Sequence, residues 1–370
     1  MRASNHGELG LIVLSSCKEL GRLVDERILQ LRAEEDDDKS YLVPIEEVRF
    51  SNGEGKIKLL DSVRGKDIYI LCDVGNYSCE YTMFGRNHCM GPDEHFQDIK
   101  RVLSAIGGKA DRVTVIMPLL YASRQHKRKG RESLDCAMAL KELENLGVHA
   151  ILTFDVHDPT IHNAIPGTSF ENIFPTYSML KCFIANEGAN IKKDNMTVIS
   201  PDTGAMDRAI YYANTLGVDV GMFYKRRDHT VVVNGKNPIV QHEYIGGPLE
   251  NKKVLIVDDM IASGESIIDI IGEISKQNVD ETFVACTFAF FTEGVAKFDK
   301  LYEEVRLTKI YTTNLSYIPQ EIRERPWLCV VDLSKYVAKI VNTLNHDDSI
   351  SSLLDATHRI RKLLKKSDMI

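Results

Sequence analysis

The chain has 370 residues, which is enough for two domains of ordinary size. Hydrophobic residues make up 44% of the sequence and charged residues 27%, as in globular proteins. The formal net charge of −7 argues against a general nucleic-acid binder, and no apolar run approaches the ~18 residues of a membrane-spanning helix. The N-terminus lacks a signal-peptide core, so we expect no membrane partner and a cytoplasmic location.

Eight cysteines are scattered along the chain, and none stands in a Cys-x-x-Cys pair. Cys136, Cys182 and Cys286 lie inside apolar runs. We therefore expect reduced, mostly buried thiols in a reducing compartment.

The first half of the chain alternates short apolar runs with helical patterns. Strands are predicted at 11–14, 41–43, 47–49, 56–60, 67–72, 113–117 and 151–154, and helices at 18–32, 96–106 and 134–146. Residues 73–97 are polar and contain glycine, which predicts a long loop.

A similar series begins again in the second half. Strands are predicted at 197–199, 220–224, 242–245, 254–257, 282–288 and 309–311, and helices at 206–216, 267–274 and 294–304. The segments 336–344 and 350–366 have helical spacing, which predicts a packing helix and tail. Strands that alternate with helices predict an α/β fold with largely parallel sheets, and this series is long enough for two such domains.

Residues 254–266 form the most informative motif. Four apolar residues at 254–257 read as a buried strand, with Asp258 and Asp259 at its carboxyl end. A turn of small residues at 262–266 then leads into a helix. Backbone N–H groups of such a turn, with a helix N-terminus behind them, favour a phosphate. The carboxylates would bind sugar hydroxyls or a cation, so the motif predicts a site for a phosphorylated sugar.

Polar clusters follow other predicted strands, where α/β enzymes place their sites. They are Arg49 to Glu54, Arg124-Gln125-His126, His157, Asp202, and Lys225 with Arg227. Each has a plainer explanation when taken alone. His157 could be a hydrogen-bonded structural histidine, and Asp202 could cap the next helix. The basic turn at 225–227 could be ordinary solvated surface, and Asn52-Gly53 is primarily a hairpin signal.

Together these motifs resemble the ribose-phosphate pyrophosphokinase family over roughly residues 45–355. The Arg-Phe-Ser-Asn-Gly-Glu at 49–54 is similar to the family's Arg-Phe-Ser-Asp-Gly-Glu, and 123–126 is similar to its Ala-Arg-Gln-Asp. The segments 153–157, 200–202 and 225–227 follow in the family's order. The motif at 254–266 takes the place of Val-Asp-Asp-Met-Ile-Asp-Thr-Gly-Gly-Thr.

The resemblance implies transfer of the diphosphoryl group of ATP to the C1 hydroxyl of ribose 5-phosphate, which gives phosphoribosyl pyrophosphate and AMP. It also implies an α/β fold with two tandem phosphoribosyltransferase-like domains, each a mostly parallel sheet flanked by helices. The ATP side is expected at 1–172, the ribose 5-phosphate side at 173–332, and a C-terminal helical tail at 333–370. Mg²⁺ is the implied cofactor, and a homo-oligomer, by resemblance a hexamer, is the implied assembly.

The resemblance also assigns roles to residues. It implies ATP contacts from Asn52, Gly53, Glu54, Arg124, Gln125 and His126, and magnesium binding by His157 and Asp202. Lys225 and Arg227 would act catalytically from a mobile loop that closes over the diphosphoryl group. Ribose 5-phosphate would be bound by Asp258, Asp259, Ala262, Ser263, Gly264, Glu265 and Ser266.

The chain departs from the family within this last motif. The family's loop aspartate is Ala262 here, and its second glycine is Glu265. Ala262 removes a carboxylate from the ribose side, and Glu265 places one near the expected phosphate. Two other functions stay open on the sequence: a non-catalytic regulatory paralogue of the synthetase, and a phosphoribosyltransferase that consumes the pyrophosphate sugar.

Overall fold

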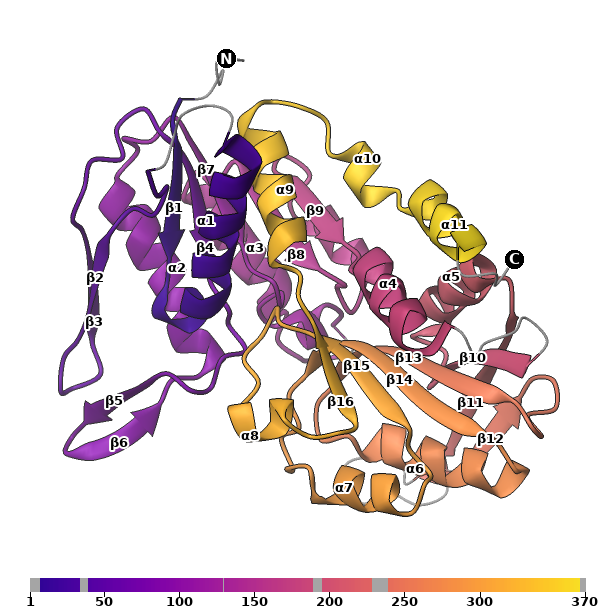
Figure 1. The fold of residues 1–370 in the computed structure, drawn as a ribbon. Coiled ribbons are helices and arrows are strands. Elements are labelled where there is room, and N and C mark those ends of the chain that lie inside the picture. The colour runs from indigo at the N-terminus through magenta and orange to yellow at the C-terminus, as the bar shows by residue number, and fades with distance from the viewer. Residues whose placement is uncertain (1–6, 34–38, 129, 189–194, 228–238, 367–370) are drawn as a thin grey trace. The chain divides into compact units, whose positions relative to one another are not determined.

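The computed structural model describes residues 7–33, 39–128, 130–188, 195–227 and 239–366, without the side chains of 225–227, 239–242 and 365–366. The chain forms two compact units, drawn in Figure 1. Unit 1 comprises Met1–Pro175, Asn314–Tyr317 and Asp332–Leu354; unit 2 comprises Thr176–Thr313, Ile318–Val331 and Asp355–Ile370. The domain boundaries at 172 and 332 stay a prediction.

Unit 1 is built on a five-stranded parallel sheet in the order β1-β4-β7-β8-β9. Its strands are β1 (Leu9–Val13), β4 (Asp67–Leu71), β7 (Arg112–Ile116), β8 (Ala150–Phe154) and β9 (Ser169–Ile173). Its helices are α1 (Lys18–Arg32), α2 (Pro92–Ile106), α3 (Asp135–Asn145), α9 (Ser334–Asn345) and α10 (Ser351–Leu354). Short 3₁₀ turns lie at η1 (Ser15–Cys17), η3 (Ser123–Gln125) and η4 (Pro159–Ala164).

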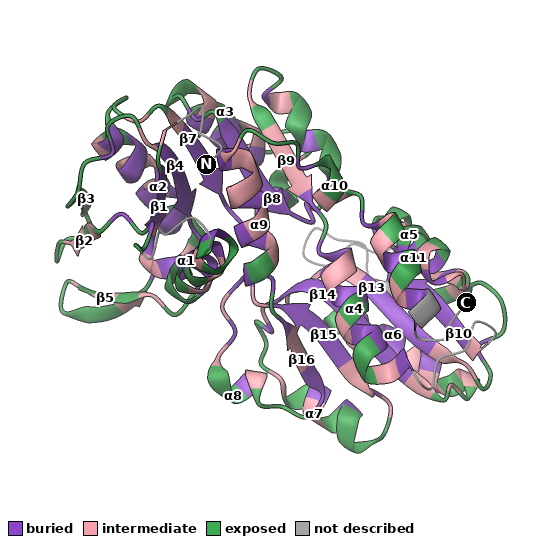
Figure 2. Ribbon diagram, turned by 45° about the horizontal axis from the view of Figure 1, so that its top comes forward, coloured by how far each residue is buried: buried purple, intermediate pink, exposed green. Residues whose placement is uncertain are grey.

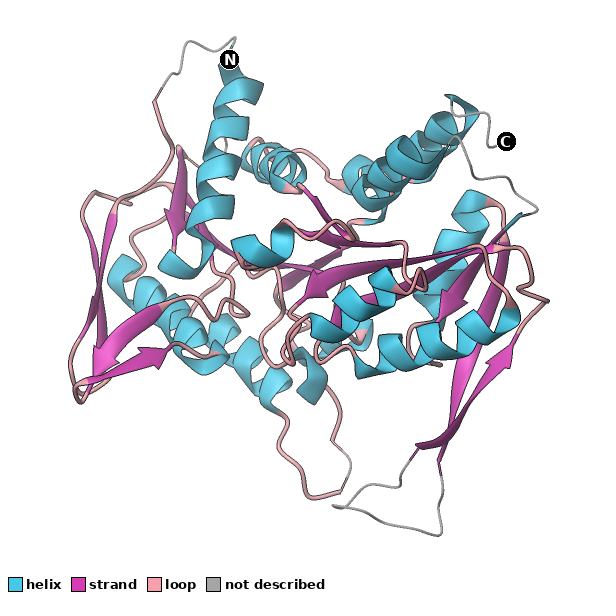
Figure 3. Cartoon of the chain, turned by 60° about the horizontal axis from the view of Figure 1, so that its bottom comes forward, coloured by secondary structure: helices cyan, strands magenta, loops and turns pink. Residues whose placement is uncertain are grey.

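Two antiparallel hairpins belong to unit 1 but lie outside this sheet, as the paired arrows of Figure 3 show. The first joins β2 (Ile45–Arg49) to β3 (Gly55–Leu59). The second joins β5 (Glu80–Met83) to β6 (Arg86–Cys89), so the prediction of one long loop at 73–97 is wrong. The predicted strand at 41–43 is reduced to a single bridge between Leu11 and Leu42.

Unit 2 is built on a seven-stranded sheet in the order β12-β11-β10-β13-β14-β15-β16, in which only β12 pairs antiparallel among the described strands. Its strands are β10 (Met196–Ser200), β11 (Asp219–Arg227), β12 (Ile239–Ile245), β13 (Lys253–Ile261), β14 (Glu281–Ala289), β15 (Lys309–Thr313) and β16 (Leu328–Val331). Its helices are α4 (Thr176–Glu187), α5 (Met206–Leu216), α6 (Glu265–Ile274), α7 (Ala296–Glu303), α8 (Gln320–Arg323) and α11 (Thr357–Lys366), and a 3₁₀ turn η7 (Ser275–Gln277) follows α6.

The two-residue period of the strands and the helical spacing of apolar residues explain how each sheet is buried (Figure 2). In unit 1, Ile68 and Ile70 of β4 pack into one core with α2 and α3, while Tyr69 between them is buried on the opposite face. In unit 2, α6 buries isoleucines at the helical spacing of three and four residues, namely Ile267, Ile270, Ile271 and Ile274. The predicted α/β class with two mostly parallel, helix-flanked sheets is confirmed.

Several elements begin or end away from their predicted limits. Helix α2 begins at Pro92 rather than at residue 96, because Pro92 suits the first helical position and Glu94 accepts a hydrogen bond from the Gly91 N–H at 3.0 Å. Strands β9 and β16 and helix α4 are absent from the sequence prediction. In the part of the chain that the structure describes, no helix has both the length and the apolar character needed to cross a bilayer.

Candidate functional site

Three of the predicted site segments meet at one edge of the unit 2 sheet. Strand β10 lies between β11 and β13 and runs parallel to both, so the carboxyl ends of these strands point to the same edge. Asp202 lies two positions beyond the end of β10. The segments 225–227 and 258–266 end β11 and β13. The structure therefore brings together the predicted metal, diphosphoryl and sugar segments of this unit.

Two adjacent carboxylates, Asp258 and Asp259, lie near the C-terminal end of β13. Asp259 is buried, and its Oδ1 accepts a hydrogen bond of 2.9 Å from the Met260 N–H. Asp258 is half-buried, and its Oδ1 accepts a hydrogen bond of 2.9 Å from the Asp259 N–H. Burial, and then the charge of Asp259, raise the pKa of Asp258, while Arg208 of α5 acts in the opposite direction. A ligand that donates hydrogen bonds or carries positive charge would therefore stabilise the ionised pair.

The turn after β13 has a backbone that requires glycine at one position. Gly264 has φ of +84°, and a Cβ built there would lie 2.5 Å from Cζ of Phe298. Helix α6 begins directly after it with Glu265, which is exposed, and the Glu265 N–H lies 3.4 Å from Oγ of Ser263. Ala262 and Ser266 are half-buried. This arrangement presents the first N–H groups of α6 beside the two carboxylates, which suits an anionic group on a polyhydroxyl ligand.

Asp202 has a local structural role in addition to its predicted one. Its Oδ1 accepts hydrogen bonds from the backbone N–H groups of Gly204 at 2.9 Å and Ala205 at 3.3 Å, directly before α5. Ser200 donates from Oγ to the Asp202 carbonyl at 2.7 Å. The plainer explanation, that Asp202 shapes the start of the following helix, therefore accounts for the hydrogen bonds of its Oδ1.

Lys225 and Arg227 lie in a strand by backbone, not in the mobile loop that the resemblance implied. Strand β11 continues to Arg227 and pairs with β12, with Lys225 opposite His242 and Arg227 opposite Ile239. A register shift falls between Arg226 and Arg227. The side chains of Lys225 and Arg227 lie outside the described residues, so their catalytic role stays a prediction.

In unit 1, the turn after β7 lies beside the turn after β8. The His126 and His157 rings have centroids 5.4 Å apart. His126 also places Nε2 3.2 Å from Oδ2 of Asp158, and Lys127 places Nζ 2.6 Å from the same oxygen. Asp158, which sequence reasoning missed, is buried, and hydrogen bonds from Lys127 and Thr160 hold its pKa below its usual value against the effect of burial. The structure thus joins the predicted ATP and metal segments of this unit.

The neighbouring Arg124 and Gln125 are exposed in η3, where the Gln125 N–H donates to the Ala122 carbonyl at 2.8 Å. Ala122 has φ of +53°, so a strained turn carries these two side chains into solvent. They are available for contact with a ligand.

Asn52, Gly53 and Glu54 form the tip of the β2–β3 hairpin. Asn52 donates from Nδ2 to Glu54 Oε2 at 3.0 Å, and the Glu54 N–H donates to Asn52 Oδ1 at 3.2 Å. The tip contacts the second hairpin, where the Phe84 N–H donates to the Ser51 carbonyl at 2.8 Å. These hydrogen bonds stabilise the tip itself and link it to the β5–β6 hairpin; none of the three involves the turn at 124–126.

Few side chains in the described residues lie close enough together to bind a metal ion. In the described segments, no cluster of three or more His, Cys, Asp and Glu side chains could hold an ion. His157 belongs to unit 1 and Asp202 to unit 2. Mg²⁺ keeps several waters and uses one or two carboxylates together with substrate phosphates. Such sparse protein ligands fit an ion that is bound together with nucleotide phosphates rather than an ion enclosed by protein.

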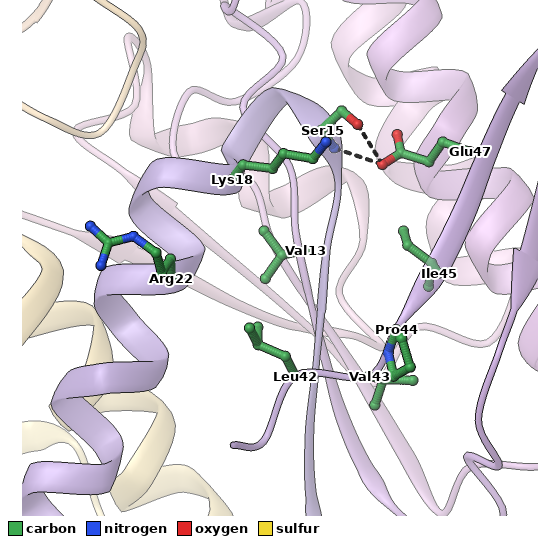
Figure 4. Close-up of a pocket in the computed structure, with 9 residues that line it drawn as sticks. All are labelled: Val13, Ser15, Lys18, Arg22, Leu42, Val43, Pro44, Ile45 and Glu47. Atoms are coloured by element: carbon green, nitrogen blue, oxygen red, sulfur yellow. Dashed lines mark hydrogen bonds between the residues drawn. The ribbon is translucent and has the colours of Figure 1, made fainter. Parts of the chain in front are cut away.

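A separate cavity of about 560 Å³ opens on unit 1 and contains none of the predicted site residues (Figure 4). Its lining residues are Val13, Ser15, Lys18, Arg22, Leu42, Val43, Pro44, Ile45 and Glu47. Ser15 donates to Oε1 of Glu47 from its N–H at 2.9 Å and from Oγ at 2.7 Å. Burial nevertheless raises the pKa of Glu47. Lys18 extends toward this pair, whereas Arg22 points away from it.

Comparison with known families places the two halves of the chain. Residues 9–147 match a family model described as the N-terminal domain of ribose phosphate pyrophosphokinase. Residues 180–319 match the phosphoribosyl transferase domain. The order of the two domains agrees with the sequence-based expectation.

Similar curated proteins carry one name. A ribose-phosphate pyrophosphokinase of Vibrio parahaemolyticus is 25% identical over 311 residues, which is 83% of this chain and 90% of that protein. One of Mycoplasma genitalium is 26% identical over 312 residues, 83% of this chain and 85% of that protein. The phosphoribosylpyrophosphate synthetase structure from Mycobacterium smegmatis has the same fold, with a TM-score of 0.73 at 20% identity over 92% of this chain and 99% of that one.

Proposed function

The chain belongs to the ribose-phosphate pyrophosphokinase family, and from this premise we propose that it transfers the β,γ-diphosphoryl group of ATP to the C1 hydroxyl of ribose 5-phosphate. The products are phosphoribosyl pyrophosphate and AMP. The observation that carries the proposal is the meeting of a carboxylate pair, a glycine-dependent turn and a helix N-terminus at one sheet edge of unit 2. A phosphorylated sugar matches this set of groups.

The acceptor is bound by the strand–turn–helix of β13 and α6. Backbone N–H groups and hydroxyls at 263–266 bind the 5-phosphate, and Asp258 and Asp259 accept hydrogen bonds from the ribose hydroxyls. The loop aspartate of the family is Ala262 here, so one carboxylate fewer faces the sugar. The exposed position of Glu265 supports this assignment, because its carboxylate is solvated rather than enclosed with the phosphate.

The donor is bound by unit 1. Arg124, Gln125 and His126 contact ATP, and the hairpin tip at 52–54 contributes to a nucleotide site, in this chain or in a neighbouring subunit. His157 and Asp202 help to hold Mg²⁺, which neutralises phosphate charge when it is bound. The protein acts in the cytoplasm as a homo-oligomer, a hexamer by family resemblance.

Lys225 and Arg227 supply positive charge to the transferring group. Phosphoryl-type transfer needs little covalent help; it needs in-line positioning and stabilisation of negative charge in the transition state. Lys225 offers a point charge, and the planar guanidinium of Arg227 can bind two oxygens. Their position at the end of β11, which is separated from the sugar segment of β13 by β10 alone, supports this role.

The test is formation of AMP by the purified full-length chain from ATP, Mg²⁺ and ribose 5-phosphate. We expect AMP only when the sugar is present, and we expect Lys225→Ala to lower kcat by about a hundredfold while KM for ribose 5-phosphate changes less than about threefold. The matched control is Lys276→Ala, which should retain activity. Lys276 is exposed and pairs with Glu273, which lies near the C-terminal end of α6. Sugar-independent AMP, or no AMP with tight binding to a catalytic relative, would contradict the proposal; the second result would favour a regulatory paralogue.

A further inference from the structure

Two cysteines that are 147 positions apart lie against each other in unit 2. Cys182 belongs to α4 and Cys329 to β16, the edge strand of the seven-stranded sheet. Their Sγ atoms are 3.6 Å apart, and both residues are half-buried. All eight cysteines of the chain are thiols in this structure. The pair therefore has reactive groups in contact and retains access to solvent.

Polar groups around the pair favour a thiolate on one side. Asn186 directs Nδ2 toward both sulfurs, 3.7 Å from Cys182 and 3.8 Å from Cys329. The hydrogen bond from Cys182, followed by the charge of Lys309 on β15, lowers the pKa of Cys329 to about 7 against the effect of burial. The same hydrogen bond, with burial, raises the pKa of Cys182. Deprotonation is therefore favoured at Cys329 over Cys182.

Lys309 is itself held in place by an acidic neighbour. Its Nζ lies 3.5 Å from Oε1 of Glu187, which also accepts a hydrogen bond of 2.7 Å from the Tyr311 hydroxyl. Glu187 opposes the thiolate on Cys329, but its effect is smaller than that of the Cys182 hydrogen bond and Lys309. The balance of groups on α4 and β15 still favours the charged sulfur.

Exposure alone would select a different cysteine. Cys89 is exposed, but its thiol donates to Oε1 of Glu80 at 3.3 Å, and this carboxylate raises the pKa of Cys89. Cys136 is buried, and burial raises its pKa to about 12. The contact with a second sulfur, together with the neighbouring Asn186 and Lys309, therefore distinguishes Cys329 as a nucleophile.

We propose that Cys329 and Cys182 form a reversible redox site, in which the sulfur of Cys329 attacks a peroxide and Cys182 then resolves the product to a disulfide that joins α4 to β16. To form the bond, the two sulfurs must approach by about 1.5 Å from their present 3.6 Å. Both residues are half-buried, and we expect a change of side-chain rotamer to bring the two sulfurs together. This inference does not depend on the proposed activity.

The reaction balances with hydrogen peroxide as the oxidant. The Cys329 sulfur attacks one peroxide oxygen, an S–O bond forms, the O–O bond breaks, and the departing hydroxide takes a proton to become water. Cys182 then loses its proton, and its sulfur attacks Sγ of Cys329. An S–S bond forms, the S–O bond breaks, and a second water leaves. Two thiols are oxidised by two electrons, and one peroxide is reduced to two waters. A dithiol reductant reverses the change.

The first experiment uses the reduced wild-type chain without any substitution. Peroxide is added at about one equivalent, remaining thiols are blocked with a maleimide, and peptides are identified by mass spectrometry. We expect a peptide pair linked through Cys182 and Cys329, lost on addition of dithiothreitol. Iodoacetamide at pH 7 should modify Cys329 about fivefold faster than Cys89, because its larger thiolate fraction outweighs its lower intrinsic nucleophilicity. This ratio should shrink as the pH is raised above 9.

Two serine variants identify the roles of the two sulfurs. In Cys182→Ser, peroxide should leave a sulfenic acid on Cys329 that dimedone traps, whereas in Cys329→Ser, Cys182 should remain a thiol. Cys89→Ser is the control and should form the linked peptide as the wild type does. Recovery of both residues as thiols after peroxide, links made only to other cysteines, or faster alkylation of Cys89 than of Cys329 at pH 7 in the unsubstituted protein would overturn the proposal.

Discussion

Asp258 and Glu265 lie seven positions apart in one strand–turn–helix, yet one is half-buried beside a second carboxylate and the other is exposed at a helix N-terminus. Asp258 lies beside the buried Asp259, so burial and like charge disfavour its ionised form. Glu265 is exposed and is the first residue of α6, where the partial positive charge of a helix N-terminus favours a carboxylate. A negative charge at Glu265 therefore stabilises the helix and, under the proposed function, opposes an incoming phosphate. The family's glycine at this position would do neither.

Replacing this charge should separate the two effects. We expect Glu265→Gln to lower KM for ribose 5-phosphate by about three- to fivefold, because a screened carboxylate near a dianion opposes binding by roughly 1 kcal/mol. The same change should reduce stability by about 0.5 kcal/mol through loss of the helix-terminus interaction. Steady-state kinetics and thermal denaturation measure the two effects. Glu273→Gln, near the other end of α6 and paired with Lys276, should leave KM unchanged. An unchanged KM in Glu265→Gln would show that this carboxylate does not act on the sugar phosphate.

At the scale of elements, the sequence predicts the alternation of strands and helices well, but it does not predict that a strand continues through polar residues. The start of β13 and the start of α6 are each predicted to within two residues. The prediction ends β13 before Asp258, because two carboxylates look like the end of a strand. In the structure β13 continues to Ile261, since β14 continues to pair with it and Asp258, Met260 and Ile261 face Cys286, Phe288 and Ala289. Pairing with a neighbour, rather than local composition, sets this limit.

The β5–β6 hairpin escapes prediction for a related reason. Its two turn residues, Phe84 and Gly85, have φ of +49° and +74°. Such turns are usually recognised by Asn-Gly or Asp-Gly, and a phenylalanine with positive φ is uncommon. The flanking strands are short and largely exposed, so no run of buried residues marks them. The contact between Phe84 and Ser51 of the first hairpin is long-range and cannot be read from local sequence.

Two glycines at opposite ends of α6 allow a test of the turn that precedes it. Gly264→Ala should destabilise the protein by about 1–3 kcal/mol, because φ is +84° and the new Cβ would meet Phe298 at 2.5 Å. It should also raise KM for ribose 5-phosphate, since under the proposed function the turn presents its N–H groups to the phosphate. Gly272→Ala lies within the helix, and its Cβ would be 3.4 Å from the flexible end of Arg306. That control should stabilise by about 0.5–1 kcal/mol. Urea denaturation and kinetics check both, and equal stability of the two variants would refute the argument.

At the scale of the whole molecule, sequence patterns locate most of the candidate site but not what supports it. The rule that parallel strands end at a common sheet edge correctly groups Asp202 with the segments 225–227 and 258–266. The effect of Arg208 on Asp258 and the position of Asp158 beside His126 depend on how helices and turns pack. Neither has a local signature, because one arginine in a helix and one aspartate before a proline are ordinary.

The assembly of unit 1 from separate segments is also invisible to local patterns. Asp67, at the start of β4, is fully buried and accepts hydrogen bonds from Arg112 on β7 and from Asn345 on α9, 278 positions away. Arg112 donates in addition to the Leu344 carbonyl at 2.9 Å. The helix predicted near 336–344 is therefore an integral part of unit 1, and a buried charge helps to hold it there. Sequence reasoning identified this helix but not its partner.

Removing one member of this buried pair should be costly. Arg112→Met leaves Asp67 without the bidentate hydrogen bonds of 2.9 and 2.7 Å from Nε and Nη2, and an uncompensated buried carboxylate costs about 3–5 kcal/mol. We expect that loss in the free energy of unfolding measured with urea. The matched control is Arg22→Met in α1, whose exposed side chain pairs with Glu26 four residues on, and which should change stability by about 0.5 kcal/mol or less. Adding Asp67→Asn to Arg112→Met should restore part of the loss, because the charge left unpaired is removed. If Arg112→Met destabilised the protein no more than Arg22→Met, the hydrogen bonds among Asp67, Arg112 and Asn345 would not be what holds α9 in unit 1.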